Sequence, residues 1–249
     1  MTAAISSELL KLRTTRSFYW LIGSVLALVL VVTIPLCAFA DFGGDGPLEA
    51  LLWIFGQFVQ ALALLLGALL VTSEFRHGTI TPSLLVVPSR TRLMGAKLIS
   101  AIVIGAALGF VSGGLIVAIV SGFGSARDFD TSGDKLQMIV GATLASGLYG
   151  ALGVGVGALV RNQVGAIVGS MLYLFVGETI ITVVLSLIDS LDDIMPRYSL
   201  GAVSNALSLV NPGDEDVLGQ VAGGLLLALY AGIFVVAGFV MMQRRDVTA

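Results

Sequence analysis

The chain has 249 residues, of which 57% are hydrophobic and 12% are charged, and its formal net charge at pH 7 is −3. An average soluble domain carries about 25% charged residues. A chain with half that fraction cannot cover a water-facing surface, which excludes an ordinary soluble enzyme. The composition instead predicts an all-α polytopic membrane protein.

The first segment, residues 1–17, predicts a short amphipathic helix. Ile5, Leu9 and Leu12 recur at helical spacing, with polar residues between them. Such a helix lies in the headgroup plane of a bilayer, and the aromatic residues 18–20 mark the entry of the chain into the membrane. The alternative is a basic flank that only fixes the topology.

Six apolar runs follow, and each is long enough to cross a bilayer as a helix. They cover residues 18–40, 50–72, 98–121, 137–160, 164–188 and 218–242. At about 1.5 Å per residue, even the shortest run exceeds a hydrocarbon core of about 30 Å. The first run also resembles a signal peptide, but it is longer than the usual apolar region of about 7–15 residues.

Basic residues are concentrated in four segments, which we predict to be cytoplasmic by the positive-inside rule. Ten of the thirteen Lys and Arg residues lie in segments 1–17, 73–97, 161–163 and 243–249. The other three lie in segments 41–49, 122–136 and 189–217, which also hold twelve of the sixteen acidic residues. Both termini are therefore expected in the cytoplasm. Glu178 is the only charged residue inside a predicted span.

Glycines recur every four residues in several spans, as at Gly105, Gly109 and Gly113. Small residues on one stripe let helix backbones approach closely in lipid. The glycine-valine run 153–157 lies within a span and lacks the Lys of a phosphate-binding loop, so we expect no nucleotide site in this chain. The single histidine, His77, lies in a loop, and no two carboxylates share a span, so the spans carry no hydrolase site.

The cytoplasmic loop 73–97 is too long for a plain turn. Thr81 and Pro82 are typical of a helix start, and an apolar patch at 84–87 lies between charged flanks. This pattern predicts a short helix that contacts a soluble partner. A basic loop on the membrane surface fits these residues equally well.

Glu178 is the second feature to explain, because a carboxylate at the centre of a membrane helix costs about 2.5–3.5 kcal/mol on insertion scales. It should therefore face protein or water. The candidate hydrogen-bond partners are Gln57, Gln60, Tyr173 and Thr182. Two interpretations stay open: a polar clamp between helices, or a functional group inside the membrane.

The segment 189–217 is acidic at both ends and mildly apolar from Leu200 to Val210. The apolar part is too short to span a bilayer, which predicts an interfacial or re-entrant helix.

Four motifs occur in order along the chain: SELLKLRTTRS near the N-terminus, Glu74-x-Arg76-x-Gly78-Thr79 followed by Pro88-x-Arg90 and Lys97, ALVRNQ at 158–163, and QRRDV at 243–247. Together they resemble the ABC type-2 permease family, the membrane subunits of bacterial exporters related to the G-subfamily of ABC transporters. In this family the motifs correspond to a connecting helix, a first cytoplasmic loop, a tight turn and a basic C-terminal end.

The resemblance implies a transport subunit that is not itself an ATPase and binds no cofactor. Two copies of a cytoplasmic ATPase, which bind ATP and Mg²⁺, would dock on the connecting helix and loop 73–97, and two six-span subunits would form a homodimer or heterodimer. The implied coupling residues are Glu74, Arg76, Gly78, Thr79, Leu84, Leu85, Arg90, Arg92 and Lys97. The second and fifth spans would line the translocation path, at Gln57, Gln60, Tyr173 and Glu178.

The expected function is outward transport of a hydrophobic or amphipathic substrate, such as a drug, a peptide antibiotic or a lipid, across the bacterial cell membrane, with no nucleic-acid partner. The resemblance also suggests a short external helix as a lid over the cavity exit. One alternative is a secondary transporter or channel with Glu178 as a proton or cation site, which the lack of a visible broken helix or inverted repeat weakens. Another is a membrane scaffold without transport activity.

Overall fold

The computed structural model of the chain describes Ser7, Leu10 and residues 16–40, 48–78, 89–127, 134–185, 187–188, 194–210 and 218–244. These residues contain helices and no strand, and six helical stretches are long and apolar enough to cross a membrane. The predicted fold class is thereby confirmed. The predicted helix at 1–17 lies outside the described residues except for Ser7, Leu10 and residues 16–17, and the tail is described only as far as Arg244.

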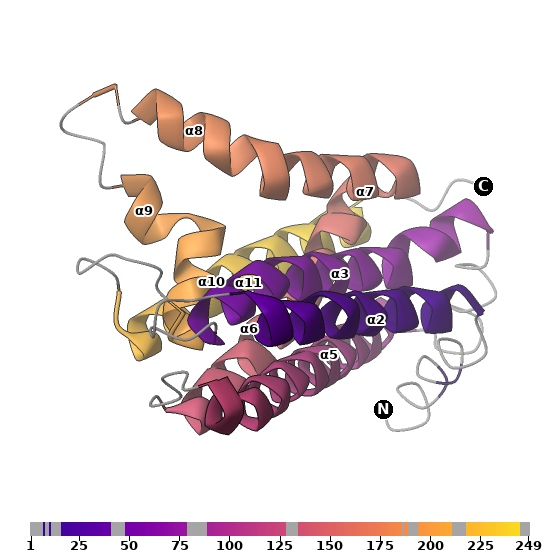
Figure 1. Cartoon of the computed structure of the whole chain (residues 1–249). Helices are drawn as coiled ribbons and strands as arrows, with labels where there is room; N and C mark the ends of the chain where they lie inside the picture. The colour runs from indigo at the N-terminus through magenta and orange to yellow at the C-terminus, as the bar shows by residue number, and fades with distance from the viewer. Residues whose placement is uncertain are drawn as a thin grey trace.

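The membrane-crossing stretches are, in chain order, α2 (Arg16–Phe39), α3 (Leu48–Arg76), α5 (Arg90–Arg127), α6 (Lys135–Val160), the continuous series α7 (Gln163–Leu172), η1 (Tyr173–Gly177) and α8 (Glu178–Leu185), and α11 (Gln220–Arg244). Two short helices, α9 (Ile194–Tyr198) and α10 (Leu200–Ser208), lie between the fifth and sixth stretches (Figure 1). Helices α3 and α5 extend further toward the loop that joins them than the hydropathy pattern predicts, so Glu74 and Lys97 belong to helices.

Helix α6 lies at the centre of the bundle and packs against α3, α5, α10 and α11. Its glycines make this close packing possible. A Cβ atom on Gly153 would collide with the backbone oxygen of Leu64 in α3, and one on Gly150 with that of Ala101 in α5. A Cβ atom on Gly155 would collide with the backbone of α11. The glycine spacing therefore serves helix packing, as small residues do in lipid.

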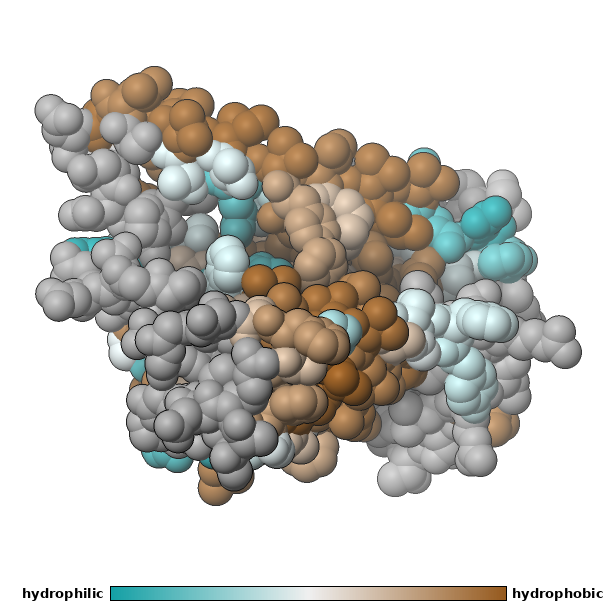
Figure 2. Space-filling view, in the orientation of Figure 1, coloured by the Kyte–Doolittle hydropathy of each residue, from teal (hydrophilic) through white to brown (hydrophobic). Residues whose placement is uncertain are grey.

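The surface of the bundle is apolar, in agreement with a membrane location. Figure 2 shows hydrophobic side chains along α7 and α8 and over α2 and α3 on the same face. The fifth stretch is the least buried of the six, since only 6% of its most apolar 18-residue segment is buried inside the protein. Its side chains are therefore available to lipid or to another subunit.

The fifth stretch contains an irregular turn that the sequence analysis did not predict. In η1 the backbone N–H of Glu178 donates to the carbonyl oxygen of Tyr173, which is a π-helical bond to the fifth residue back. The stretch nevertheless runs without a gap from Gln163 to Leu185, so it is irregular but not a broken helix, and the argument against secondary transport is unchanged.

Helix α10 lies inside the bundle. Val203 and Ser204 have no exposed surface, and the helix packs against α6 and α11. It begins beside Tyr149, near the middle of α6, and its Leu207 lies against Gly141, nearer the start of α6. Residues 200–210, for which an interfacial or a re-entrant helix was predicted, thus contain a short helix buried among the membrane-crossing stretches.

We predict that Gly153→Val lowers the stability of the protein, because the new side chain would force α3 and α6 apart. Overpacking of this kind costs about 1–3 kcal/mol or more, which corresponds to a fall in Tm of roughly 5 °C or more for a chain of this size. The measurement is thermal unfolding of the purified protein in detergent. Gly232→Val is the matched control, because a Cβ atom there meets nothing within 4 Å. Equal Tm values for the two variants would contradict the packing role.

Candidate functional site

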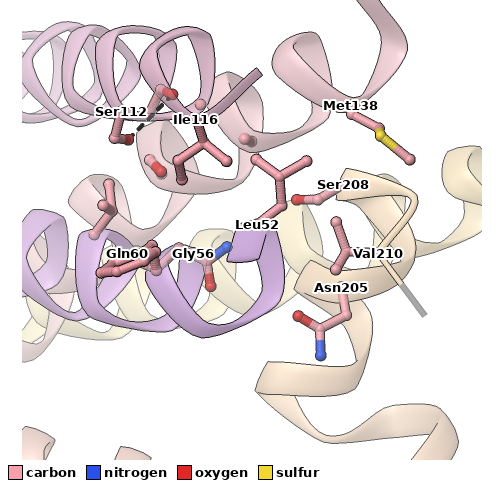
Figure 3. Close-up of a pocket in the computed structure, with 15 residues that line it drawn as sticks. Leu52, Gly56, Gln60, Ser112, Ile116, Met138, Asn205, Ser208 and Val210 are labelled. Carbon is pink, nitrogen blue, oxygen red and sulfur yellow. Dashed lines mark hydrogen bonds between the residues drawn. The ribbon is translucent and has the colours of Figure 1, made fainter. Parts of the chain in front are cut away.

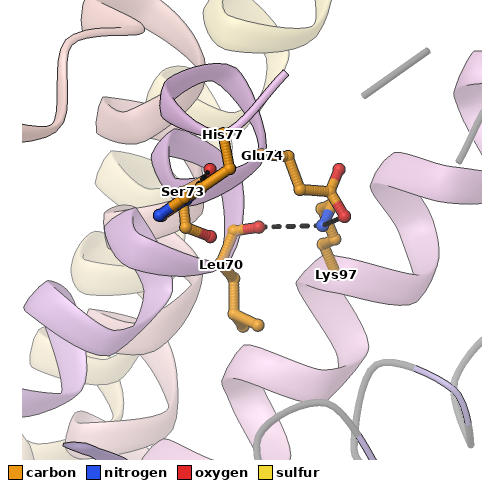
Figure 4. A network of polar contacts seen from close by, with 5 residues as sticks. All are labelled: Leu70, Ser73, Glu74, His77 and Lys97. Atoms are coloured by element: carbon orange, nitrogen blue, oxygen red, sulfur yellow. Dashed lines mark hydrogen bonds and ion pairs between the residues drawn. The ribbon is translucent and has the colours of Figure 1, made fainter. Parts of the chain in front are cut away.

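The predicted coupling residues lie at the end of the bundle where α3 ends and α5 begins, which we call the loop end. Here Lys97 Nζ lies 2.9 Å from Glu74 Oε1 and donates a hydrogen bond of 2.8 Å to the carbonyl oxygen of Leu70 (Figure 4). Glu74 is 6% exposed and Lys97 is 3% exposed. The ion pair therefore joins α3 to α5 inside the protein.

Because this pair is buried, Glu74 and Lys97 are not available for contact with a partner protein. Glu74 and Lys97 face each other, whereas Arg76 and Arg92 are exposed and can meet another protein. Gly78 has a φ of +65°, a conformation that glycine adopts without strain, and it ends the turn after α3. The exposed charged surface at the loop end is thus smaller than the sequence pattern predicts.

The remaining coupling candidates are only partly covered by the structure. Arg90 is the first residue of α5. Thr79, Leu84 and Leu85 lie outside the described residues, so the predicted short helix of the loop stays a prediction.

Two residues of the ALVRNQ motif, Arg161 and Gln163, also make contacts at the loop end. Arg161 Nη2 donates to the carbonyl oxygen of Met241 in α11 at 3.2 Å, and its guanidinium lies 5.2 Å from the ring centre of Phe75 in α3. Arg76 Nη1 donates to Gln163 Oε1 at the start of α7, at 3.1 Å. These contacts connect the ends of α3, α7 and α11.

The turn between α6 and α7 shows what Arg161 and Asn162 of this motif do. Arg161 takes a left-handed conformation with φ 56° and ends α6. The Asn162 side chain then accepts hydrogen bonds from the backbone N–H groups of Val164 and Gly165, at 3.0 and 3.2 Å, which caps α7. The cap could be recognised from the sequence, but the contact with Met241 could not.

The predicted path residues gather around α10 in the bundle interior. Gln57 Nε2 donates to Asn205 Oδ1 at 3.3 Å, and Gln60 Oε1 accepts from Ser204 Oγ at 3.0 Å. Both glutamines come from α3, and both bond to the side chains of α10. The structure thus brings Gln57 and Gln60 to one surface, as their spacing predicts.

Glu178 reaches the same helix from α8, and a Cβ atom on Gly201 would lie within 4 Å of both its carboxylate and the Gln57 amide. Its Oε1 accepts a hydrogen bond of 3.1 Å from the backbone N–H of Gly201, in the first turn of α10. This N–H has no partner within its own helix, and a negative charge is favourable at a helix N-terminus. The side chain of Thr182 donates to the backbone carbonyl of Glu178 instead of to its carboxylate. The partner of Glu178 is therefore a backbone group, which the sequence analysis missed.

Two tyrosines complete the attachment of α9 and α10. Tyr149 of α6 donates to the carbonyl oxygen of Leu200 at 3.2 Å, and Tyr230 of α11 donates to that of Tyr198 at 2.9 Å. Side chains from α3, α6, α8 and α11 therefore all hold α9 and α10 in place.

Two cavities in the described part of the bundle are lined in part by α10 or its first residues. The smaller, about 20 Å³, has the size of one water molecule and lies between α3, α5, α6 and α10 (Figure 3). Its polar lining includes Gln60, Ser112, Asn205 and Ser208, which Figure 3 shows around the cavity. The larger cavity, of about 450 Å³, lies between α6, α7, η1, α11 and the start of α10. Tyr173 lines this larger cavity.

The described residues contain no cluster of three side chains that could hold a metal ion. The large cavity is lined mainly by apolar and tyrosine side chains, so its surface fits an uncharged or amphipathic molecule better than an ion.

We predict that Lys97→Met strongly destabilises the protein, because it leaves the carboxylate of Glu74 buried without its cation. Breaking a buried pair costs about 3–5 kcal/mol, so Tm in detergent should fall by roughly 10 °C. Arg92→Met is the control, since Arg92 is exposed. The double variant Glu74→Gln with Lys97→Met should recover most of the loss. A Tm for Lys97→Met equal to that of the Arg92 control would show that the pair does not stabilise the bundle.

Comparison with known proteins completes the description. The family model of an ABC-2 family transporter protein matches residues 4–177, which is more than half of the chain and ends at the last residue of η1. No curated protein matches the chain. On this evidence, and as the motifs predicted, the chain belongs to the ABC-2 transporter family, whose members are the membrane components of ABC transporters and work with an ATPase partner.

Proposed function

We propose that this chain is the membrane-spanning permease subunit of an ATP-driven exporter in the bacterial cell membrane. Its family membership supports the transport role and the ATPase partner. The concentration of basic residues in alternate segments supports cytoplasmic termini and a cytoplasmic loop end. ATP and Mg²⁺ would be bound by the partner ATPase, and two ATPases would serve two permease subunits, identical or paralogous.

The observation that carries this proposal is the buried ion pair between Glu74 and Lys97. The connection from α3 to α5 begins and ends close to this pair, so an ATPase bound to it would pull on two helices that are already tied together. Because α3 and α5 both pack on α6, their joint displacement would reach the centre of the bundle. The pair thus acts as a mechanical link and not as a docking contact.

The docking surface would be formed by the exposed charges Arg76 and Arg92 together with the loop between them. Opposite charges on the ATPase would fix its register on this surface. The loop side chains that we propose as further contacts are Thr79, Leu84, Leu85 and Arg90, with Gly78 allowing the bend.

The proposed path follows the side of the bundle that carries α7 and α8. The apolar surface of this stretch would face a second permease subunit, and the cavity of about 450 Å³ opens among its side chains. The chemistry of the cavity lining supports a hydrophobic or amphipathic substrate moving outward. Tyr173 would contact the substrate, while Gln57, Gln60 and Glu178 shape the outer part of the path through α10.

A secondary transporter or channel is the second candidate, because the irregular turn η1 directly precedes Glu178. Its cation site would need the carboxylate of Glu178, which already accepts a hydrogen bond from the backbone of Gly201. The two candidates differ in their energy source, since only the exporter needs ATP hydrolysis.

The test is ATP-driven transport in proteoliposomes that contain this chain and the P-loop ATPase encoded beside it. We predict that Glu74→Lys reduces transport at least tenfold while the ATPase keeps hydrolysing ATP, because the link between α3 and α5 is lost. Restoring the opposite pairing with Glu74→Lys and Lys97→Glu should recover part of the transport. Glu49→Lys is the matched control, because Glu49 is exposed at the other end of α3.

Transport that follows an ion gradient and ignores ATP would refute the exporter proposal. Unchanged ATP-driven transport in the Glu74→Lys variant would refute the mechanical link alone.

A further inference from the structure

We infer that the π-helical turn η1 is a rotational switch, which sets α8 so that Glu178 holds α10 closed against the large cavity. Return of this turn to a regular α-helix would turn Glu178 away and release α10. The role of the switch in export rests on the proposed function, whereas the switch itself depends only on residues of this chain. It also concerns residues beyond the family match, which ends at Gly177.

The first step is the position of Glu178 relative to the cavity. One face of α7 and η1 lines the cavity, through Ala166, Ser170, Tyr173 and Leu174. Glu178 follows on that stretch, directly after η1, and bonds to Gly201. The opposite wall of the cavity includes Ser199 and Leu200, which lie next to Gly201. The bond from Glu178 to Gly201 therefore joins the two walls at the edge of the cavity.

The second step is the freedom of α8 to turn. None of its residues is buried, and its main contacts are with η1 and α9 instead of the central helices. The other groups that hold α9 and α10 come from α6 and from α3 and α11, which both pack on α6. Glu178 is thus an attachment from an element that can rotate with little loss of packing.

The third step is the register that η1 creates. A bond to the fifth residue back encloses one residue more than the α-helical bond to the fourth. One residue corresponds to about 100° of rotation and 1.5 Å of rise. If η1 became α-helical, Gly177 would occupy the position that Glu178 now has. Glycine has no side chain to reach Gly201, so the attachment would be lost.

The fourth step is the contact that keeps η1 in place. The ring of Phe175 lies 5.7 Å from that of Phe58 in α3, centre to centre. Helix α3 also carries Glu74 at the loop end. A displacement of α3 would therefore act on η1 directly, which connects the switch to the proposed coupling link.

The test measures access to the cavity and needs neither an ATPase nor a substrate. Leu174 is replaced by Cys in a Cys37→Ser background, and the full chain in lipid vesicles is labelled with a membrane-impermeant maleimide from the side on which α9 lies. We expect Glu178→Ala to raise the labelling rate about tenfold, equivalent to about 1.4 kcal/mol at 25 °C. Glu178→Gln keeps the acceptor oxygen and should label at nearly the parental rate.

A deletion tests the role of the π turn separately. Removing Val176 takes out the extra residue and leaves Glu178 facing α10 on a regular helix, so labelling of Leu174→Cys should be no faster than in the parent. The same deletion should abolish ATP-driven transport, because the switch can no longer turn. Removing Val184, which lies beyond Glu178 in α8, is the matched deletion and should keep transport.

Correct folding is checked with Leu187→Cys, an exposed site beyond the end of α8 that should label equally in every variant. A parental labelling rate for Glu178→Ala would overturn the attachment role of Glu178. Labelling of the Val176 deletion as fast as that of Glu178→Ala, or normal transport by that deletion, would overturn the switch. The labelling outcomes are separate from failure of the exporter proposal, which would leave the labelling rates unchanged, and only the transport outcome of the deletion presupposes that proposal.

Discussion

The structure depends on the narrow surface of α6, whose glycines let four other elements touch its backbone. Helices in lipid gain little from apolar burial alone, because lipid tails are as apolar as side chains, so close van der Waals contact must hold them together. Gly150 and Gly153 supply that contact toward α5 and α3, and Gly141 supplies it toward α10. With α6 fixed at the centre, Tyr149 is placed to bond with the start of α10. The packing of small residues therefore positions the polar interior.

A short helix inside the bundle creates a second requirement, because the first N–H groups of α10 have no partners within the helix. Ser199 accepts from Ala202 N–H, and Glu178 accepts from Gly201 N–H. This requirement gives a physical reason for a carboxylate in the fifth stretch, whereas the two glutamines on α3 bond to the side chains of Asn205 and Ser204. The clamp interpretation of Glu178 thus has direct geometric support, while contact with a substrate stays a proposal.

The hydropathy pattern was enough to predict six membrane-crossing helices and a short helix within 200–210, because both depend on the length of apolar runs. It failed where an interaction joins distant residues. Glu74 and Lys97 are charged and lie near a loop, so the sequence pattern assigns them to the surface, but each neutralises the other inside the bundle. The π turn leaves no trace in composition, since it differs from an α-helix only in which carbonyl Glu178 N–H selects. The bond from the Gly201 N–H to Glu178 could not be predicted either, because every residue has a backbone and the sequence does not mark which N–H group a carboxylate will meet.

We propose that an ATPase bound at the loop end moves α3 and α5 as one body. This can be measured as the distance between spin labels at His77→Cys and Thr91→Cys, two exposed sites beside the proposed docking charges, in a Cys37→Ser background diluted with unlabelled subunits and bound to the ATPase. We expect this distance to be the same with and without ATP, while the distance from Thr91→Cys to Val221→Cys, an exposed site near the start of α11, changes. A change of several ångströms between positions 77 and 91 on ATP binding would refute the joint movement.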